Sequence, residues 1–238
     1  MEAYLAEIEH LSERFTGLVA EALDMEPAVF AKFFKKPCMS GIKIAAYPAP
    51  DASEGTKTEF QGVGPHKDGS FLTYLLQGTE HSSLEVQNKS GEWIAAPPVP
   101  GTLVVNIGRS LEALTQGVCV ATTHRVNLTS EQYSGRQPGG GPLGTRLSFP
   151  FFQMFGFDVT QEDIQLDIPD HITSLRDESV RSDAESFFEG LFKTVIGEAF
   201  IINALTSHPE VGKRWYPEAL ADALRKQEEG KKLDDAKV

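Results

Sequence analysis

The sequence predicts a mainly β domain of the sandwich or barrel class, with helices before and after the β region. Three observations predict it. Apolar residues recur at helical spacing near the N-terminus, short β-type runs fill residues 41–157, and helical spacing returns beyond them. The β runs are separated by Gly, Pro, Asn and Ser rather than by helical segments, which favours a sandwich or barrel over alternating strands and helices.

The helices are expected near both ends of the chain. Residues 2–23 carry a long amphipathic pattern, and a short helix opening with Pro27 should follow at about 26–34. A later helix is expected over 183–205. We expect one domain, with N-terminal helices, a β core, a C-terminal helical region and a charged, solvated tail at 1–40, 41–157, 158–225 and 226–238.

The expected strands are short, and a loop rich in Gly and Pro at residues 134–145 separates the last two. The strands are expected at residues 42–47, 72–77, 84–87, 103–107, 118–126 and 146–152.

Composition is typical of a soluble globular protein. With 40% hydrophobic and 24% charged residues, the chain can bury a sizeable core. The formal net charge of -12 argues against nucleic acid and anionic membranes as partners, because both attract basic patches. Cys38 and Cys119 are too few for a disulfide framework, and the sequence has no signal peptide or membrane-spanning run. We therefore expect a soluble, cytoplasmic protein without a membrane partner.

The run His66-Lys67-Asp68 predicts a metal site. Residues two apart on a strand point to the same face, so His66 and Asp68 project together. An imidazole and a carboxylate are two of the three ligands of a facial iron(II) site, and His124, after another β run, is the candidate for the second imidazole. Three protein ligands leave room on an octahedral ion for a chelating 2-oxo acid and dioxygen. A His-x-Asp run alone is common, so the prediction depends on the rest of the pattern.

Arg146 and Ser148 are also two apart on an expected strand. The Arg guanidinium can hold a carboxylate through two hydrogen bonds, and a Ser hydroxyl can donate to the same group. Taken alone, the pair would be interpreted as a surface Arg beside a Ser.

A series of motifs between Ile42 and Phe155 resembles the C-terminal half of the isopenicillin N synthase-like oxygenases, a family that includes flavonoid and gibberellin oxidases. The motifs occur in the family's order. They are GPHKD (64–68), TYLLQ (73–77), LEV (84–86), GEW (91–93), PGTLVVNIG (100–108), LTQG (114–117), HRV (124–126) and RLS (146–148).

The resemblance implies a double-stranded β-helix, which is a distorted, cupin-like jelly roll with iron at one open end. It implies a non-haem Fe(II) enzyme that uses 2-oxoglutarate and O2, with His66, Asp68 and His124 as metal ligands. The expected enzyme is a dioxygenase that hydroxylates, desaturates or cyclises a small, largely apolar organic molecule, in secondary metabolism. A monomer or homodimer is expected.

The same resemblance assigns the cosubstrate pocket. Arg146 and Ser148 would hold the distal carboxylate of 2-oxoglutarate, and Tyr47, which precedes a Pro, would lie near that carboxylate. Phe152 shares the inner face of its expected strand with Arg146, so it is a candidate for the substrate wall. Core packing is an equally expected role for Phe152.

The sequence departs from the family pattern in four places. Ala45 stands where an Asn often occurs, Arg109 replaces an acidic residue, and the loop at 134–145 is longer, which suggests a mobile cover over the substrate entrance. The family's segment before the first long helix is absent, so an exposed sheet edge or a dimer contact is expected. Four histidines without partner spacing are expected on the surface, and these are His10, His81, His171 and His208.

Two other functions fit parts of the pattern. An iron oxidase of the same fold that does not use 2-oxoglutarate would keep the metal ligands and the Arg-x-Ser pair. A non-catalytic barrel that binds a small molecule would not need all five of these side chains, so their presence together favours an enzyme.

Overall fold

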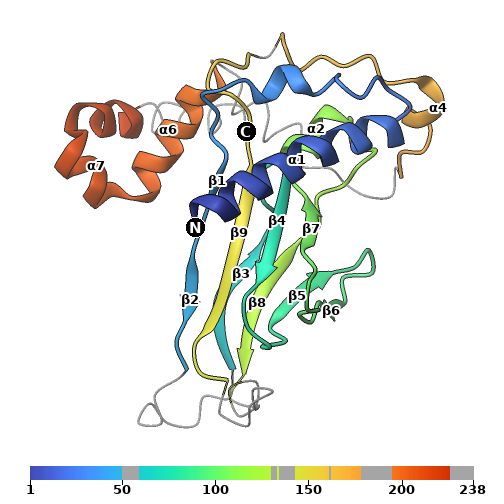
Figure 1. Cartoon of the computed structure of the whole chain (residues 1–238). Coiled ribbons are helices and arrows are strands. Elements are labelled where there is room, and N and C mark those ends of the chain that lie inside the picture. The colour runs from blue at the N-terminus through green and yellow to red at the C-terminus, as the bar shows by residue number, and fades with distance from the viewer. Residues whose placement is uncertain (50–58, 130–132, 134–142, 161, 178–194, 226–238) are drawn as a thin grey trace, which may run out of the picture.

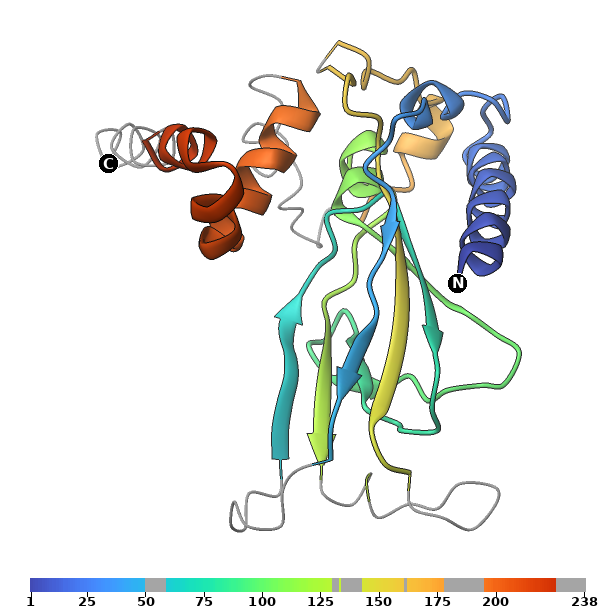
Figure 2. The same cartoon turned by 60° about the vertical axis from the view of Figure 1, so that its left-hand side comes forward.

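Two antiparallel sheets form the centre of the protein (Figures 1 and 2). One has five strands in the order β1-β9-β4-β7, with β2 also paired to β9, and the other has four in the order β3-β8-β5-β6. The computed structural model describes residues 1–49, 59–129, 133, 143–160, 162–177 and 195–225. The strands of the first sheet are β1 (Gly41–Ile42), β2 (Ala45–Tyr47), β4 (Leu72–Gln77), β7 (Val104–Ile107) and β9 (Arg146–Gln153). Those of the second are β3 (Glu59–His66), β5 (Leu84–Gln87), β6 (Trp93–Ala95) and β8 (His124–Thr129).

The long N-terminal helix α1 (Glu2–Ala22) crosses the outer face of the five-stranded sheet (Figure 1). Its Phe15 ring meets Tyr74 edge-on, with centroids 6.0 Å apart, and Gln153 donates a hydrogen bond of 2.8 Å to Thr16. The main hydrophobic cluster therefore includes residues of α1 and of the five-stranded sheet, and it extends to later segments through Leu111 and Ile172. It contains a group of fully buried aromatic side chains, namely Phe30, Phe33, Phe71, Tyr74, Phe151 and Phe155.

Alternation along β4 and β9 separates this core from a cavity on the other side of the sheet. Tyr74 and Phe151 point outward into the helix-covered cluster. Their neighbours Thr73 and Phe152 line a pocket that residues of both sheets enclose. The aromatic core thus supports the five-stranded sheet from outside, and the space between the sheets stays available for binding.

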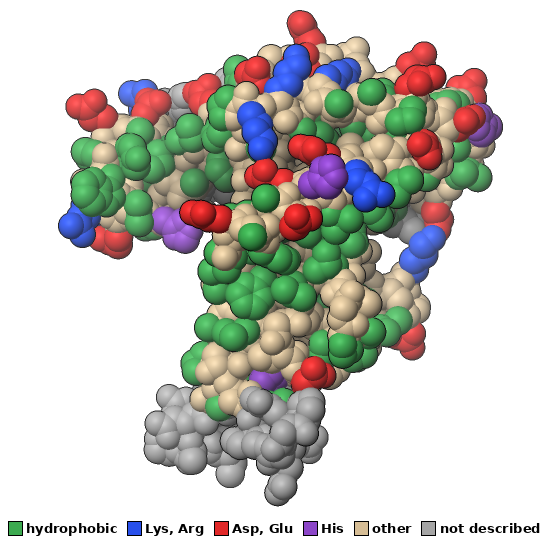
Figure 3. Space-filling view, viewed as in Figure 1, with side chains coloured by type: hydrophobic (Ala, Val, Ile, Leu, Met, Phe, Trp, Pro, Cys, Tyr) green, Lys and Arg blue, Asp and Glu red, His purple; other side chains and the backbone are tan. Residues whose placement is uncertain are grey.

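The remaining helices lie above and beside the sheets (Figure 1). They include the 3-10 helix at Ala31–Phe34, α2 (Arg109–Leu114), α4 (Asp170–Thr173), α6 (Ile196–Ser207) and α7 (Pro209–Trp215), and residues 217–225 are helical as well. Figure 3 shows apolar side chains gathered over α6 and α7, where Ile201, Val211 and Trp215 are exposed. Within the described residues, no helix combines the length and the apolar character needed to cross a bilayer.

Several predicted elements are confirmed, including the long first helix and the strands at 72–77 and 84–87. The helix predicted at 26–34 is a turn followed by one 3-10 helix. Most of the helix predicted at 183–205 and most of the loop at 134–145 lie outside the described residues. The short helix α2 was not predicted.

The strand predicted at 118–126 is wrong over its first six residues, because β8 begins only at His124. Two backbone N–H groups before it bond to side chains instead of to a neighbouring strand. The N–H of Cys119 donates to the Thr115 hydroxyl at 3.0 Å, and the N–H of Ala121 donates to the Glu112 carboxylate at 3.0 Å. Apolar periodicity cannot reveal these bonds, since both acceptors belong to the preceding helical turn and its end.

We predict that Gly108→Ala destabilises the protein by roughly 3 kcal/mol, because the added methyl group overpacks a backbone contact. A Cβ at Gly108 would lie 1.9 Å from the carbonyl oxygen of Ser70. Urea unfolding measures the change. Gly41→Ala is the matched control, since a Cβ there meets nothing within 4 Å. Equal stability of the two variants would contradict the tight packing between the start of α2 and the 68–70 turn.

Candidate metal centre and adjoining pocket

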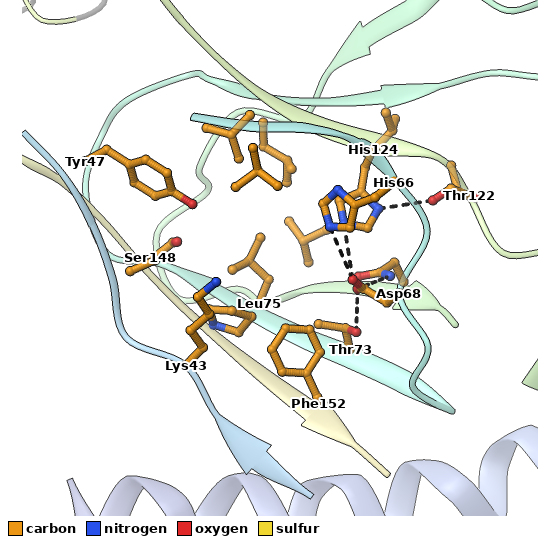
Figure 4. Close-up of a pocket in the computed structure, with 18 of the residues that line it drawn as sticks. Lys43, Tyr47, His66, Asp68, Thr73, Leu75, Thr122, His124, Ser148 and Phe152 are labelled. Carbon is orange, nitrogen blue, oxygen red and sulfur yellow. Dashed lines mark hydrogen bonds and ion pairs between the residues drawn. The ribbon is translucent and has the colours of Figure 1, made fainter. Parts of the chain in front are cut away.

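The three predicted metal ligands converge at one end of the sheets. His66 is the last residue of β3 and His124 is the first of β8, and the two are direct cross-strand partners. Their ring centroids lie 4.3 Å apart. Asp68 follows two residues after β3, and its Oδ1 lies 3.5 Å from His66 Nε2 and 3.6 Å from His124 Nε2 (Figure 4). All three ligand atoms lie within 4.8 Å of one another.

Backbone carbonyls fix the orientation of both imidazole rings. His66 Nδ1 lies 2.8 Å from the carbonyl oxygen of Gly64, and His124 Nδ1 lies 3.1 Å from that of Thr122. A carbonyl can only accept, so each Nδ1 carries the proton and donates it. In the neutral rings both Nε2 lone pairs then face the Asp68 carboxylate. A cation between the three atoms removes the resulting repulsion, and metal-binding histidines are commonly oriented by such carbonyls.

Asp68 is buried, and its second oxygen is already occupied. Oδ2 accepts hydrogen bonds from Thr73 Oγ1 at 2.7 Å and from Asn106 Nδ2 at 3.0 Å. Burial alone would raise the pKa of Asp68, but the hydrogen bond with His66, the charge of His124 and the bonds from Asn106 and Thr73 lower it from 3.8 to about 2. The hydrogen bond with Asp68 in turn raises the pKa of His66. Asp68 is therefore an anion at neutral pH, with Oδ1 directed at the two histidines.

Helix α2 holds both segments that carry the ligands. The N–H of Arg109 donates to the carbonyl of Asp68 at 2.8 Å. Glu112 is fully buried, and its Oε2 accepts from Ala121, three residues before His124, while lying 3.6 Å from the Lys67 ammonium. Lys67 points away from the metal ligands, as the strand alternation predicts, and meets Glu112. The role of Glu112 was not predicted, because no rule of sequence spacing links a helix residue to these two turns.

The pocket beside the ligands has a cavity volume of about 120 Å³. Figure 4 shows the metal ligands at one end and Tyr47 and Ser148 at the other. Most of the wall between them is apolar, and Phe152 lies in it as predicted. The apolar part of the wall includes Leu75, Leu84, Val86, Val104, Val126 and Phe152.

Arg146 and Ser148 line the far end of the pocket from β9, and both are buried. Tyr47 pairs in register with Arg146, and the Arg146 guanidinium carbon lies 4.8 Å from the centre of the Tyr47 ring. The Nη1 atom of Arg146 is buried without a hydrogen-bond partner among the described residues. A buried N–H group without an acceptor raises the free energy of the folded protein, and a bound carboxylate would supply the missing acceptor.

The prediction that His81 lies on the surface is wrong, since it is only 1% exposed. Its ring packs edge-on against Tyr133 with centroids 4.9 Å apart, and its Nδ1 lies 2.9 Å from Thr79 Oγ1. Burial and the nearby charge of Arg146 lower the pKa of His81. The turn that carries His81 has a polar, surface-like sequence, and its burial depends on the distant Tyr133. The other three histidines predicted at the surface, His10, His171 and His208, are exposed.

We predict that Glu112→Gln costs about 2 kcal/mol of stability, because it removes one charge of a buried ion pair and leaves Lys67 partly desolvated. Glutamine keeps an acceptor for the Ala121 N–H, so the loss of stability measures the contribution of the negative charge of Glu112. Guanidinium unfolding of the metal-free protein measures it. Glu210→Gln is the control, since Glu210 pairs with Lys213 on the exposed surface and should change stability little. An equally small loss in both variants would show that the Glu112 pair does not support the site.

Comparison with known proteins agrees with this geometry. Residues 38–154 match the model of the 2OG-Fe(II) oxygenase superfamily. The chain is 46% identical over 236 residues to a 2-oxoglutarate-dependent dioxygenase of Gibberella zeae, which covers 99% of this chain and 61% of that protein. It is 42% identical over 235 residues to 2-oxoglutarate-dependent dioxygenase frbJ of Dothideomycetidae sp. (strain 11243), covering 95% of this chain and 60% of that protein. The chain therefore spans about three fifths of the length of these relatives.

Among solved structures, a full-length protein of Neurospora crassa in complex with alpha-KG matches with a TM-score of 0.57 at 18% identity. The match covers 79% of this chain and 55% of that one. It confirms the predicted fold, a double-stranded β-helix with flanking helices. The chain belongs to the 2OG-Fe(II) oxygenase superfamily.

Proposed function

We propose that this chain carries the catalytic domain, over residues 1–238, of a non-haem Fe(II)- and 2-oxoglutarate-dependent dioxygenase that oxidises a small organic molecule. One observation carries the proposal. A single pocket has three converging metal ligands at one end and, at the other, a buried guanidinium whose Nη1 has no hydrogen-bond partner among the described residues. An iron ion and a dicarboxylate would satisfy both ends.

The donor set fits iron(II). His66, Asp68 and His124 would hold the metal, since two imidazoles and one carboxylate on one side of an ion are typical of non-haem iron oxygenases. Both rings already present Nε2 toward the common point, so little reorientation is needed. Asp68 is held by two further hydrogen bonds and would enter the site as an anion.

The opposite end fits the distal carboxylate of 2-oxoglutarate. Arg146 would bind it through paired N–H donors, Ser148 would donate its hydroxyl, and the Tyr47 side chain would lie beside it. Ala45 pairs with Ser148 in register and offers no side-chain donor. The carboxylate would therefore be bound by Arg146, Ser148 and Tyr47 without a contribution from Ala45.

Bound iron(II) and 2-oxoglutarate would use dioxygen to oxidise a C–H bond of the substrate, with succinate and carbon dioxide as the other products. The chain's own residues position the reactants. Arg146 and Ser148 fix the cosubstrate, and the apolar wall that includes Leu75 and Phe152 excludes water and contacts the substrate. Hydroxylation, desaturation and cyclisation all begin with such a bond and all fall within the proposal.

The apolar wall and the similarity to fungal dioxygenases support a role in secondary metabolism. Cys38 and Cys119 are both free thiols, which supports the proposed cytoplasmic location. That the protein is a monomer or homodimer stays a prediction.

The central test is anaerobic titration of the protein with iron(II) and then 2-oxoglutarate. We expect the visible charge-transfer band of the chelate in the wild type and no band in His66→Ala or Asp68→Ala. Arg146→Met should keep iron binding but weaken 2-oxoglutarate binding about a hundredfold, because it removes a charge-assisted bidentate contact.

His171→Ala is the matched control, because His171 is exposed and its ion-pair partner among the described residues is Asp24 at the surface. A band that persists in His66→Ala would sink the ligand assignment. Iron binding without any response to 2-oxoglutarate would favour the iron oxidase that does not use this cosubstrate. No iron binding by the folded protein would favour the non-catalytic barrel.

A further inference from the structure

One cation in the pocket has no part in the site as proposed. Lys43 lies between β1 and β2 and lines the same pocket as the metal ligands. Its backbone N–H donates to the carbonyl of Pro150 at 3.0 Å, which anchors it to β9. Figure 4 shows its side chain reaching into the pocket near Ser148 and Leu75.

The Lys43 ammonium makes no hydrogen bond or ion pair with the described residues. Every other charged side chain that lines this pocket already has a role in the proposed site. The residue as a whole is exposed, so water can solvate its charge while the pocket is empty. A substrate that fills this largely apolar pocket would displace that water and leave the ammonium without an acceptor.

The alternation along this edge places Lys43, Ala45 and Tyr47 on the pocket side. Ala45 has no polar side-chain atom that could pair with the Lys43 ammonium. The positive charge of Lys43 also acts on the metal site. Like burial, it opposes the hydrogen bond with Asp68, which raises the pKa of His66, so Lys43 lies within electrostatic reach of the metal ligands.

Charge balance in the loaded pocket leaves Lys43 uncompensated. The charges of a divalent metal and of Arg146 are balanced by those of Asp68 and the two carboxylates of 2-oxoglutarate. Lys43 then contributes one positive charge beside an apolar wall. A neutral substrate would bury that charge unpaired, whereas an anionic substrate would pair with it.

We propose that Lys43 is an anion-binding residue for the substrate, and that the substrate is a small organic acid with an apolar body and a carboxylate. This inference rests on the proposed function and narrows its substrate class. The carboxylate would pair with the Lys43 ammonium, and the apolar body would lie along the wall that includes Leu75 and Phe152.

The test uses the full chain loaded with zinc and 2-oxoglutarate, which forms the site without turnover. Three acids, namely isobutyrate, cyclohexanecarboxylate and phenylacetate, are each compared with the corresponding neutral amide by saturation-transfer NMR. In the wild type we expect at least one acid to bind roughly tenfold more tightly than its amide. Lys43→Met should abolish this preference and Lys43→Arg should keep it.

Lys89→Met is the matched control and should keep the preference, since Lys89 pairs with Asp177 on the exposed surface. No acid bound more tightly than its amide would overturn the proposal. A preference that survives in Lys43→Met would also overturn it, because the acid would then be held by another group such as the metal.

A second measurement separates this inference from the function on which it rests. The anaerobic band with iron(II) and 2-oxoglutarate should form in Lys43→Met with unchanged 2-oxoglutarate affinity. A loss of that affinity would assign Lys43 to the cosubstrate and overturn the substrate role. A band without any acid preference overturns this inference alone, whereas no band in the wild type overturns the proposed function and this inference with it.

Discussion

The arrangement of the site depends on two imidazoles and one carboxylate that face one another, with Asp68 Oδ1 at 3.5 Å from His66 Nε2 and 3.6 Å from His124 Nε2. Nδ1 of each ring donates its proton to a backbone carbonyl, and Oδ2 of Asp68 accepts hydrogen bonds from Thr73 and Asn106. When both rings are neutral, the three atoms that face the centre, namely the two Nε2 atoms and Asp68 Oδ1, are all electron-rich. Strands β3, β4, β7 and β8 each supply one of these groups or its support, so the sheets are organised around a place for a cation.

A buried ion pair and a helix-supported sheet maintain this arrangement. Glu112 on α2 ties the turn before His124 to Lys67, which stands between the other two ligands. On β4 and β9, the outward residues pack with α1 into an aromatic core. The inward residues are not needed for this core and line the pocket. Stability and binding are therefore assigned to opposite faces of the same strands.

Local sequence rules predicted the features that are themselves local. Two-residue alternation placed His66 with Asp68 and Arg146 with Ser148, and the ordered motifs predicted the fold. The rules failed where side chains distant in the sequence determine the local structure or the burial of a residue. Ala121 bonds to Glu112 instead of extending a strand, and His81 is buried because Tyr133 covers it. Lys43 was missed for the same reason, since only the folded sheet places it in the pocket.

The most direct measurement is anomalous X-ray diffraction from crystals of the protein soaked anaerobically with manganese(II) and 2-oxoglutarate. We predict one strong peak about 2.1 Å from His66 Nε2, His124 Nε2 and an Asp68 oxygen, with the dicarboxylate extending from the metal to Arg146. A peak bound by other residues, or well-ordered ligand atoms without a metal between the three side chains, would contradict it.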